Sequence, residues 1–274
     1  MNLSEADFEY IRRLVRRHAA IVLDGGKSYL AEARLEPLAR QEGFASLALL
    51  VARLRCEQAS ALHRKVVEAM TTNETLFFRD FHPFEALRTT ILPALIAQRA
   101  SARRLNVWCA ACSTGQEPYS VALLLREHFP DLGSWQLHLL ATDLSGAVLA
   151  RAQEGHYSQL EVNRGLPATL LVKYFEKTGK RWQLKPTVRE MVTFEQLNLS
   201  HPWPSLPPMD IVFLRNVLIY FEVATRKAIL GRVRQTMQPD GYLVLGASET
   251  PRPLDDSWVR VPPERAGVYQ LRGH

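Results

Sequence analysis

The sequence is poor in cysteine and has no long apolar run. Its three cysteines among 274 residues form an odd, sparse set, which argues against a disulfide framework and fits a reducing compartment. No run of about 18 apolar residues that could span a membrane is present. The first residues also lack the basic-then-apolar pattern of a secretion signal. We therefore expect a cytoplasmic protein with no direct membrane insertion.

A metal site and a nucleic-acid site also lack their signatures. Cys109 and Cys112 form a C-x-x-C pair, but a zinc ribbon needs a second pair, which the sequence does not have. We predict no metal, and a redox-active pair is the less favoured interpretation because Cys109 is expected to end a strand. The formal charge of +6 is mildly basic, but no basic motif with interleaved aromatics appears. We expect an acidic protein surface as partner, no nucleic acid, and a monomer.

The content of the chain is otherwise that of a globular protein. Hydrophobic residues make up 47% and charged residues 23% of the sequence, and the length suits one large domain plus a small one. Residues 1–70 predict an all-helical domain, with helices starting near residue 5 and spanning 29–41, 45–54 and 57–70. Ser4 and Asp7 resemble a capping box that opens the first helix.

The first helix has two faces of opposite character. Its apolar face is formed by Phe8, Ile11, Leu14 and Val15. Its opposite arc carries Arg12, Arg13, Arg16 and Arg17. Like charges at helical spacing repel each other, so we interpret this arc as a docking face for an acidic helix. A merely solvated face is the alternative.

From residue 71 onward the pattern changes. Residues 71–83 have a polar start and an aromatic end, which predicts a connecting segment packed onto a second domain at 84–274. A helix is expected at 83–99. Strands are predicted at 105–109, 136–142, 191–195, 210–214, 241–246 and 267–272, and helices near 115–128, 145–153 and 223–237. This alternation favours an α/β fold with a mostly parallel, doubly wound sheet. Residues 156–190 break the rhythm and predict an insertion with short antiparallel strands.

Ligands of doubly wound sheets bind beyond the carboxyl ends of the strands. Gly115 and Glu117 follow the first predicted strand, Asp143 ends the second, and Arg215 and Asn216 follow the fourth. A nicotinamide dinucleotide needs a richer glycine pattern, and Glu117 would repel its phosphates. S-adenosylmethionine, which carries a ribose and an amine but no phosphate, fits better. The alternatives are a first-turn helix carboxylate for Glu117 and a helix N-cap for Asp143.

Four segments, at residues 71–80, 110–120, 141–145 and 215–221, resemble those of CheR-type chemotaxis receptor methyltransferases and occur in the same order. The resemblance implies a class I S-adenosylmethionine-dependent methyltransferase domain with an inserted β-subdomain and a small helical N-terminal domain. It also implies methylation of glutamate side chains on the cytoplasmic helical bundles of chemoreceptors, at membrane receptor arrays, for chemotactic adaptation. It leaves room for a regulatory protein partner. The alternatives are a non-catalytic, cofactor-sensing adaptor of the same fold and a small-molecule methyltransferase.

The resemblance implies roles for individual residues. Cofactor-binding residues would be Asn73, Thr75, Arg79, Gly115, Glu117, Asp143, Asn198, Leu199, Arg215 and Asn216. Glu117 would hold the amino group, Asp143 the ribose and Asn198 with Leu199 the adenine. Because a substrate glutamate is already ionised at neutral pH, the reaction needs positioning and no general base. Arg79 would grip the substrate carboxylate and Tyr220 would orient it.

One departure from the family concerns the inserted subdomain. Some members use a glycine-bearing loop there to hold a short C-terminal peptide of the receptor. The corresponding stretch at residues 174–182 has a single glycine, Gly179, and is shorter. We therefore predict that this chain does not depend on such a tether.

Overall fold

The structure, a computed structural model, describes residues 3–57 and 60–273. The chain divides into two compact units. The first contains residues 1–72 together with Tyr220–Thr225, and the second contains Asn73–Ile219 and Arg226–His274. The predicted domains and the predicted helix 57–70 include residues 1–2, 58–59 and 274, which lie outside the described residues. None of the described helices is long and apolar enough to cross a membrane.

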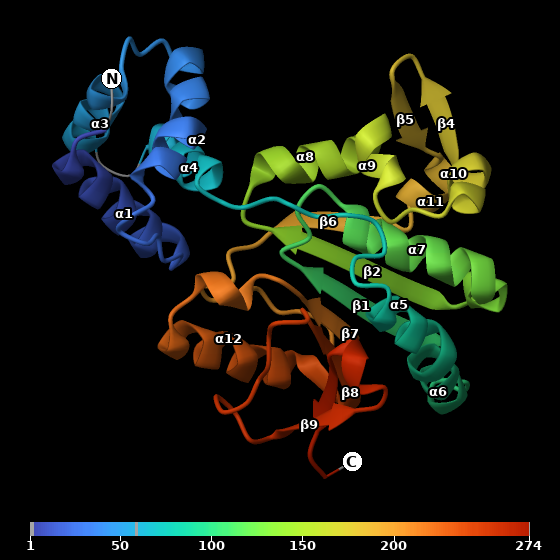
Figure 1. The fold of residues 1–274 in the computed structure, drawn as a ribbon. Helices are drawn as coiled ribbons and strands as arrows, with labels where there is room; N and C mark the ends of the chain where they lie inside the picture. Colours follow the sequence, from blue (N-terminus) through green and yellow to red (C-terminus); the bar gives the residue numbers. More distant parts are fainter. Residues whose placement is uncertain (1–2, 58–59, 274) are drawn as a thin grey trace. The chain divides into compact units, whose positions relative to one another are not determined.

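The first unit is built from α1 (Glu5–Ala19), α2 (Ser28–Gln41), α3 (Leu47–Cys56) and α4 (Ala61–Ala69) (Figure 1). Helix α1 begins where the Ser4 side chain accepts the Asp7 N–H, as the capping pattern predicts. Its predicted apolar face, Phe8, Ile11, Leu14 and Val15, is buried, which confirms that part of the prediction.

Two helices of this unit begin later than predicted because a serine caps each of them. The Ser46 hydroxyl accepts the Leu49 N–H, so α3 starts at Leu47 rather than residue 45. Ser60 precedes α4, and its N–H donates to the His63 ring at 3.2 Å, so this helix starts at Ala61 rather than residue 57.

The second unit contains a seven-stranded sheet. Its strands, in spatial order, are β6 (Val192–Gln196), β2 (Gln136–Asp143), β1 (Arg104–Ala110), β7 (Met209–Leu214), β8 (Met237–Leu245), β10 (Val268–Leu271) and β9 (Trp258–Val261). The first five pair in parallel, and β10 pairs antiparallel with both β8 and β9. The mostly parallel sheet is confirmed, although the sequence did not predict β9, and β8 begins earlier than residue 241.

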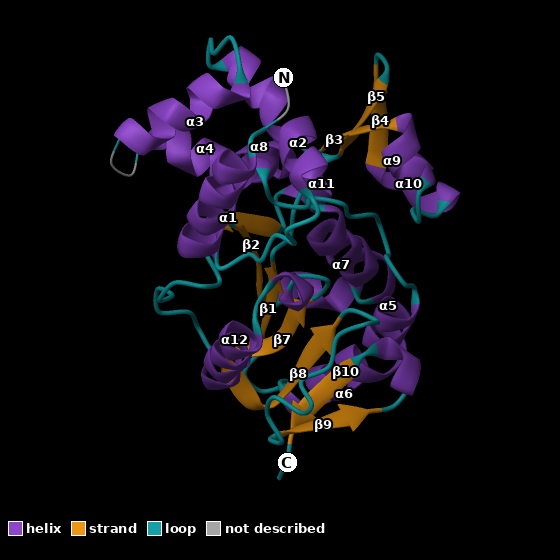
Figure 2. Cartoon of the chain, turned by 60° about the vertical axis from the view of Figure 1, so that its left-hand side comes forward, coloured by secondary structure: helices purple, strands orange, loops and turns teal. Residues whose placement is uncertain are grey.

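Helices flank this sheet, and Figure 2 shows its central strands between α12 (Val223–Thr236) and the pair α5 (His82–Ala86) and α7 (Gln116–His128). Helix α8 (Gly146–Glu154) packs on β2 and β6. The helix predicted at 83–99 is interrupted by a π-turn at Leu87–Ile91 before α6 (Leu92–Gln98). Pro93 near the start of α6 cannot donate an N–H, which explains the wider turn just before it.

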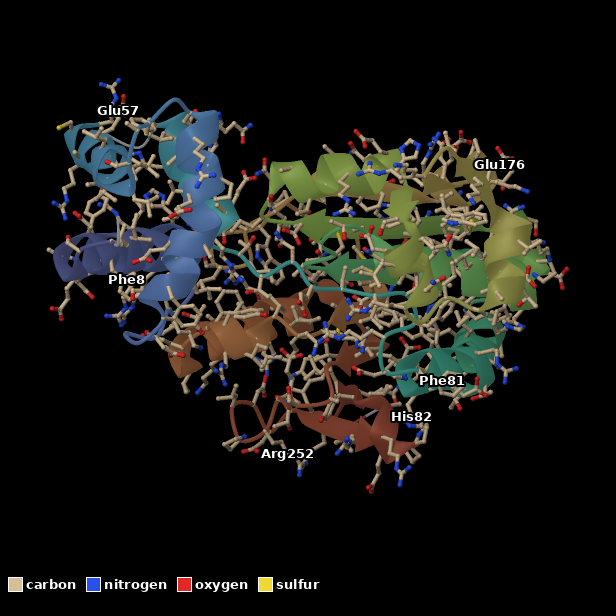
Figure 3. The ribbon with its side chains drawn as sticks, turned by 45° about the horizontal axis from the view of Figure 1, so that its top comes forward. Phe8, Glu57, Phe81, His82, Glu176 and Arg252 are labelled. Carbon is tan, nitrogen blue, oxygen red and sulfur yellow. The ribbon has the colours of Figure 1, made fainter. Side chains whose placement is uncertain are left out.

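The insertion predicted at 156–190 forms a small antiparallel sheet in the order β3-β5-β4. Its strands are β3 (His156–Ser158), β4 (Phe175–Thr178) and β5 (Arg181–Leu184), accompanied by α9 (Gln159–Asn163), α10 (Ala168–Tyr174) and α11 (Pro186–Arg189). Gly179 and Lys180 alone connect β4 to β5, and the Glu176 side chain of β4 points outward (Figure 3). The predicted fold class is therefore confirmed.

The strand order fixes where a ligand can bind. From β1 the chain proceeds to β2 on one side, and β7 pairs with β1 on the other. The order therefore reverses at β1, and the carboxyl ends of β1, β2 and β7 border the switch point of the sheet.

Candidate active site

The turn between β1 and α7 lies at this switch point and packs closely on its neighbours. Ser113 has a φ of 51° and Gly115 a φ of 90°, in the left-handed region that disfavours side chains. A Cβ on Gly115 would lie 2.9 Å from the Ala152 Cβ of α8. The Cys112 N–H donates to the Thr142 carbonyl at 2.9 Å and ties the turn to β2. Gly115 is therefore required by the geometry of the turn.

Asp143 ends β2 and is held by backbone groups of this turn. One carboxylate oxygen accepts the Ser113 N–H at 2.8 Å, and the other accepts the Ser145 N–H at 3.0 Å. The Asp143 carbonyl accepts the Leu197 N–H just beyond β6. The N-cap of α8 is Ser145, whose hydroxyl accepts the Val148 N–H, so the N-cap interpretation of Asp143 is wrong.

Glu117 and Arg215 form a buried ion pair, which the sequence did not predict. The Arg215 Nη1 donates to the Glu117 carboxylate at 2.7 Å. The Nη2 donates to the Asp80 carboxylate at 2.7 Å and to the Arg79 carbonyl at 2.9 Å. Burial raises the pKa of Glu117, and the neighbouring Arg215 opposes this shift without cancelling it. Besides being in the first turn of α7, Glu117 is therefore part of a charged cluster.

This cluster presents charges of both signs. The Arg215 guanidinium pairs with the carboxylates of Asp80 and Glu117, and the charge of Arg79 also acts on Glu117. The Arg215 Nε is buried and has no hydrogen-bond partner within the described ranges. A buried donor without a partner, next to carboxylates, fits a zwitterionic amino-acid group better than it fits a phosphate.

Residues 73–81 of the connecting segment are anchored against the turn. The Asn73 carbonyl accepts the Ser113 hydroxyl at 2.8 Å, and the Phe78 N–H donates to the Ser120 hydroxyl at 2.9 Å. Positive φ values occur at Phe78, Asp80 and Phe81, namely 48°, 69° and 50°. Such backbone strain persists only where the surroundings impose it, and it is concentrated at functional sites.

The side chains of this segment differ in their surroundings. Arg79 is half-buried, its Nη1 donates to the Glu74 carbonyl at 3.2 Å, and its charge acts on Glu117. Thr75 is half-buried as well. The exposed Phe81 and the adjacent His82 point outward in Figure 3. The sequence missed Asp80, although it directly follows Arg79 in a segment already singled out.

Asn198 and Leu199 follow β6, close in sequence to the Leu197 that contacts Asp143. The Asn198 side-chain oxygen accepts the Ser200 N–H at 2.9 Å and its hydroxyl at 2.7 Å. Leu199 is buried, and its carbonyl accepts a bond from Arg232 at 2.8 Å. These contacts fix the loop beside the end of β6.

Asn216 follows Arg215 at the end of β7 and has a φ of 58°. Its N–H donates to the Glu249 carboxylate at 2.6 Å. Glu249 is buried, and the sequence did not predict a role for it. A signal was available, because Glu249 lies shortly after the end of β8, and Asp143 was predicted from a similar position at the carboxyl end of β2.

The residues predicted for substrate contact belong mostly to the first unit. Tyr220 is half-buried there, and its carbonyl accepts the Val22 N–H at 2.9 Å. Arg12 contacts Glu9 and the Leu23 carbonyl.

Arg16 pairs with Glu222 at 2.8 Å. Arg13 lies 3.8 Å from Glu9 and is largely exposed, and Arg17 is exposed. The expectation of four mutually repelling arginines is therefore corrected, because internal carboxylates engage Arg12 and Arg16.

The cysteine pair lies in a buried environment that disfavours the thiolate form. Cys109 and Cys112 are both free and buried. Burial, reinforced by the neighbouring Glu117, raises the pKa of both thiols far above the ordinary value, so the reactive thiolate is disfavoured. No group of three or more metal-ligating side chains occurs in the described part of the chain.

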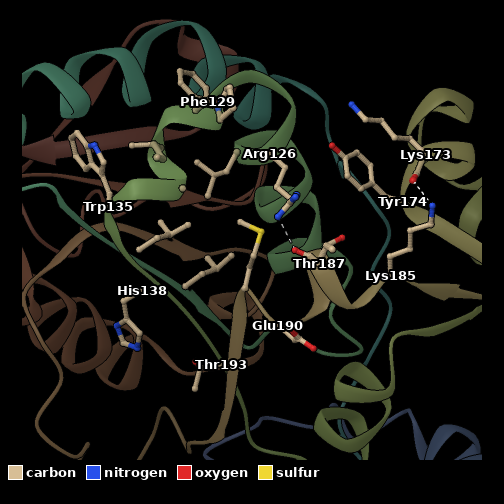
Figure 4. Close-up of a pocket in the computed structure, with 17 residues that line it drawn as sticks. Arg126, Phe129, Trp135, His138, Lys173, Tyr174, Lys185, Thr187, Glu190 and Thr193 are labelled. Carbon is tan, nitrogen blue, oxygen red and sulfur yellow. Dashed lines mark hydrogen bonds between the residues drawn. The ribbon is translucent and has the colours of Figure 1, made fainter.

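A hollow of about 870 Å³ lies elsewhere in the second unit (Figure 4). It is lined by the amino-terminal half of β2, the end of α7 and parts of the insertion, whereas Asp143 is at the other end of β2. Its basic rim is already engaged, since Arg126 donates to the Thr187 carbonyl and Lys185 to the Lys173 carbonyl. The hollow is therefore separate from the charged cluster.

Comparisons with known proteins agree with this arrangement. Residues 73–264 match the family model described as CheR methyltransferase, SAM binding domain, and residues 6–71 match the model described as CheR methyltransferase, all-alpha domain. A chemotaxis protein methyltransferase 1 of Pseudomonas aeruginosa is 43% identical over 99% of this chain and all of its own length. Chemotaxis protein methyltransferase Cher2 of Pseudomonas putida is 41% identical with the same coverage.

These matches extend over both units and include every segment that forms the charged cluster. They identify S-adenosylmethionine as the cofactor and methyl transfer as the reaction. The predicted protein family, enzyme class and cofactor are therefore confirmed. The chain belongs to the CheR methyltransferase family.

Proposed function

We propose that this enzyme methylates glutamate side chains of chemoreceptors, giving glutamyl methyl esters that serve chemotactic adaptation. The observation that carries the proposal is the acidic site at the switch point, where Asp143 ends β2 and Glu117 lies in the first turn of α7, after the neighbouring strand β1. The relatives are named chemotaxis protein methyltransferases, and chemoreceptors are the substrate that this name suggests. The enzyme would act in the cytoplasm at receptor arrays.

The residues present fit S-adenosylmethionine, which supplies a methyl group bonded to a positive sulfur. Asp143 would accept the ribose hydroxyls, and Glu117 would face the amino group. Arg215, through its orphaned Nε, and Asn216 would line the methionine end. The other members of the site would be Asn73, Thr75 and Arg79 from the connecting segment, Gly115 in the turn, and Asn198 and Leu199 along the adenine.

The protein's task in the reaction is to position the substrate. A glutamate with a pKa near ~4.3 is already a carboxylate at neutral pH, so no residue needs to remove a proton. Arg79 would hold that carboxylate in line with the transferred methyl group, and Tyr220 would orient it. Alignment of this kind can contribute several kcal/mol to lowering the barrier.

Receptor docking is assigned to the exposed arc of α1. Arg13, Arg16 and Arg17 are exposed, but Arg16 pairs with Glu222 at 2.8 Å and Arg12 with Glu9 at 2.6 Å, whereas the contact of Arg13 with Glu9 is long, at 3.8 Å. Arg13 and Arg17 are therefore the members proposed to meet the receptor. An acidic receptor helix would be attracted to this arc by charge complementarity, which raises the association rate in particular. The proposed function involves no nucleic acid and no membrane insertion, and it does not require a dimer.

Methyl transfer from tritiated S-adenosylmethionine to receptor-containing membranes tests the proposal. We expect base-labile label on the receptor, released as methanol under mild alkali, because glutamyl methyl esters hydrolyse there. The Asp143→Asn variant, which lacks the carboxylate proposed to accept the ribose hydroxyls, is the negative control and should not transfer the methyl group. Label on small molecules alone would contradict the receptor as substrate, and binding without any transfer would indicate an adaptor.

A further inference from the structure

The Glu249 carboxylate joins the ends of two neighbouring strands. One oxygen accepts the Asn216 N–H at 2.6 Å and the Gly246 N–H at 2.9 Å. The other oxygen accepts the Leu218 N–H at 2.8 Å. The Glu249 N–H in turn donates to the Gly246 carbonyl at 2.9 Å. A single buried side chain therefore satisfies three backbone donors, two beyond β7 and one beyond β8.

These bonds hold the loop that follows β7 in one conformation. Asn216 has a φ of 58°, in the left-handed region, which asparagine adopts more readily than most residues other than glycine. Its N–H and that of Leu218 bind the two oxygens of the same carboxylate, so the loop between them cannot relax without breaking a bond. Arg215, directly before Asn216, belongs to the charged cluster through its contact with Glu117.

We propose that Glu249 is a positioning residue of the cofactor site. It fixes the backbone that presents Arg215 and Asn216, and it thereby sets the affinity for the methionine end of S-adenosylmethionine and S-adenosylhomocysteine. The inference deepens the proposed function and rests on its placement of the cofactor at these two residues. Glu249 itself contacts backbone groups, so its effect reaches the cofactor through the loop.

The bonding pattern makes glutamine an informative replacement. Both oxygens of Glu249 accept backbone N–H groups, and glutamine offers one oxygen and one NH₂ group. At least one backbone donor therefore loses its acceptor in Glu249→Gln, although size and shape are kept. Glu249→Asp keeps both oxygens on a shorter side chain and is the conservative variant.

A second variant perturbs the same loop without changing the carboxylate. A Cβ on Gly246 would lie 2.7 Å from both the Glu249 Oε2 and the Asn216 Nδ2, and 3.0 Å from the Asn216 N. Gly246→Ala would therefore push apart the groups that Glu249 joins. It should mimic Glu249→Gln even if the latter folds poorly.

The matched control is Glu161→Gln in the inserted subdomain. Glu161 likewise accepts a backbone N–H, that of Ser158 at 2.9 Å, together with the Ser158 hydroxyl at 2.8 Å. It caps α9, outside the loops proposed to hold the cofactor. This variant should lower the melting temperature without changing cofactor affinity.

Calorimetric titration with S-adenosylhomocysteine, melting curves of the free protein and kcat and KM measurements test the proposal. We expect Glu249→Gln and Gly246→Ala to weaken binding about tenfold, which is a difference of about 1.4 kcal/mol, and to raise KM more than they lower kcat. Glu249→Asp should recover part of the affinity. Asp143→Asn serves as the reference variant, because it should weaken cofactor binding at the proposed site directly.

The outcomes separate this inference from the proposed site. If Asp143→Asn loses affinity while Glu249→Gln and Gly246→Ala bind within twofold of the unaltered protein, the role of Glu249 is overturned. If none of the three loses affinity, the proposed cofactor site itself is overturned. A lowered melting temperature with unchanged affinity would show that Glu249 only stabilises the fold.

Discussion

Arg215 lies 2.7 Å from Glu117, and the two side chains are only 1% and 11% exposed. They come from β7 and α7, 98 positions apart in the sequence. Charges this far removed from water depend on each other, because each has lost most of its hydration. The pair therefore matters for stability as well as for the cofactor.

Removing one partner should be costly. In Arg215→Met the Glu117 charge stays buried without compensation, and we expect a loss of about 3 kcal/mol in the free energy of unfolding. Urea denaturation of Arg215→Met and of the unaltered protein measures this difference in the free energy of unfolding. The double variant Arg215→Met/Glu117→Gln should recover much of this loss, since no buried charge remains. A single variant as stable as the unaltered protein would contradict the dependence.

The raised pKa of Glu117 predicts a pH dependence of cofactor binding. Because burial raises this pKa above the ordinary 4.5, the folded protein takes up the proton at a pH where a free glutamate is still ionised. The ionised form costs stability above the raised pKa, and this cost disappears below the unfolded value. Holding an amino group requires the ionised form, so affinity should fall as the pH drops through the raised pKa.

Calorimetry with S-adenosylhomocysteine from about pH 8 to pH 5 measures this dependence. Glu117→Gln should bind more weakly at neutral pH and lose the step. If the variant keeps the same pH profile as the unaltered protein, another group is responsible and Glu117 does not hold the amino group.

Local sequence rules predicted the residues that lie at the switch point of the sheet. Gly115, Glu117 and Asp143 were predicted because they follow strands of recognisable apolar pattern, and the structure places them at the switch point. The contact between Arg215 and Glu117 could not be predicted this way. It arises from the pairing of β1 with β7, which no local pattern encodes.

Three further features of the fold could not be predicted from the local sequence for the same reason. Strand β9 has only four residues, Trp258–Val261, and it forms by pairing with β10 at the edge of the sheet. Phe78 and Asp80 have positive φ values in a segment held by distant residues, because the Phe78 N–H donates to the Ser120 hydroxyl and the Asp80 carboxylate accepts a bond from Arg215. Tyr220–Thr225 belongs to the helical unit, where Ile21 and Phe221 form a β-bridge. Contacts between distant segments of the chain decide all three.

Arg79 should separate binding from transfer. In Arg79→Ala we expect S-adenosylhomocysteine to bind while methyl transfer falls about 100-fold or more, because the substrate carboxylate loses its alignment. Arg88→Ala removes a similarly half-buried arginine, which pairs with Glu85 in the same unit, and is the matched control. If Arg79→Ala turned over close to the rate of the unaltered enzyme, the proposal that Arg79 aligns the substrate carboxylate would be contradicted.

The docking arc can be tested without changing the arginines of the two short ion pairs, Arg12–Glu9 and Arg16–Glu222. Reversing Arg13 and Arg17 to glutamate should weaken receptor methylation, chiefly through a higher KM for the receptor, and should do so most at low ionic strength. Affinity for S-adenosylhomocysteine should not change. The control is Arg40→Glu/Arg53→Glu, which makes the same charge change on exposed arginines of α2 and α3. An equal effect of both double variants would show that overall charge, and not a docking surface on α1, determines the rate of receptor methylation.

The short connection in the inserted subdomain predicts that a receptor tail peptide does not bind tightly. Only Gly179 and Lys180 link β4 to β5, so the subdomain lacks a longer glycine-bearing loop that could close over a peptide. Calorimetric titration with the C-terminal peptide of a cognate receptor should therefore show no micromolar binding. S-adenosylhomocysteine added to the same sample provides the control for folded protein. Receptors with and without that tail should be methylated at equal rates, and a clear preference for the tailed receptor would contradict the prediction.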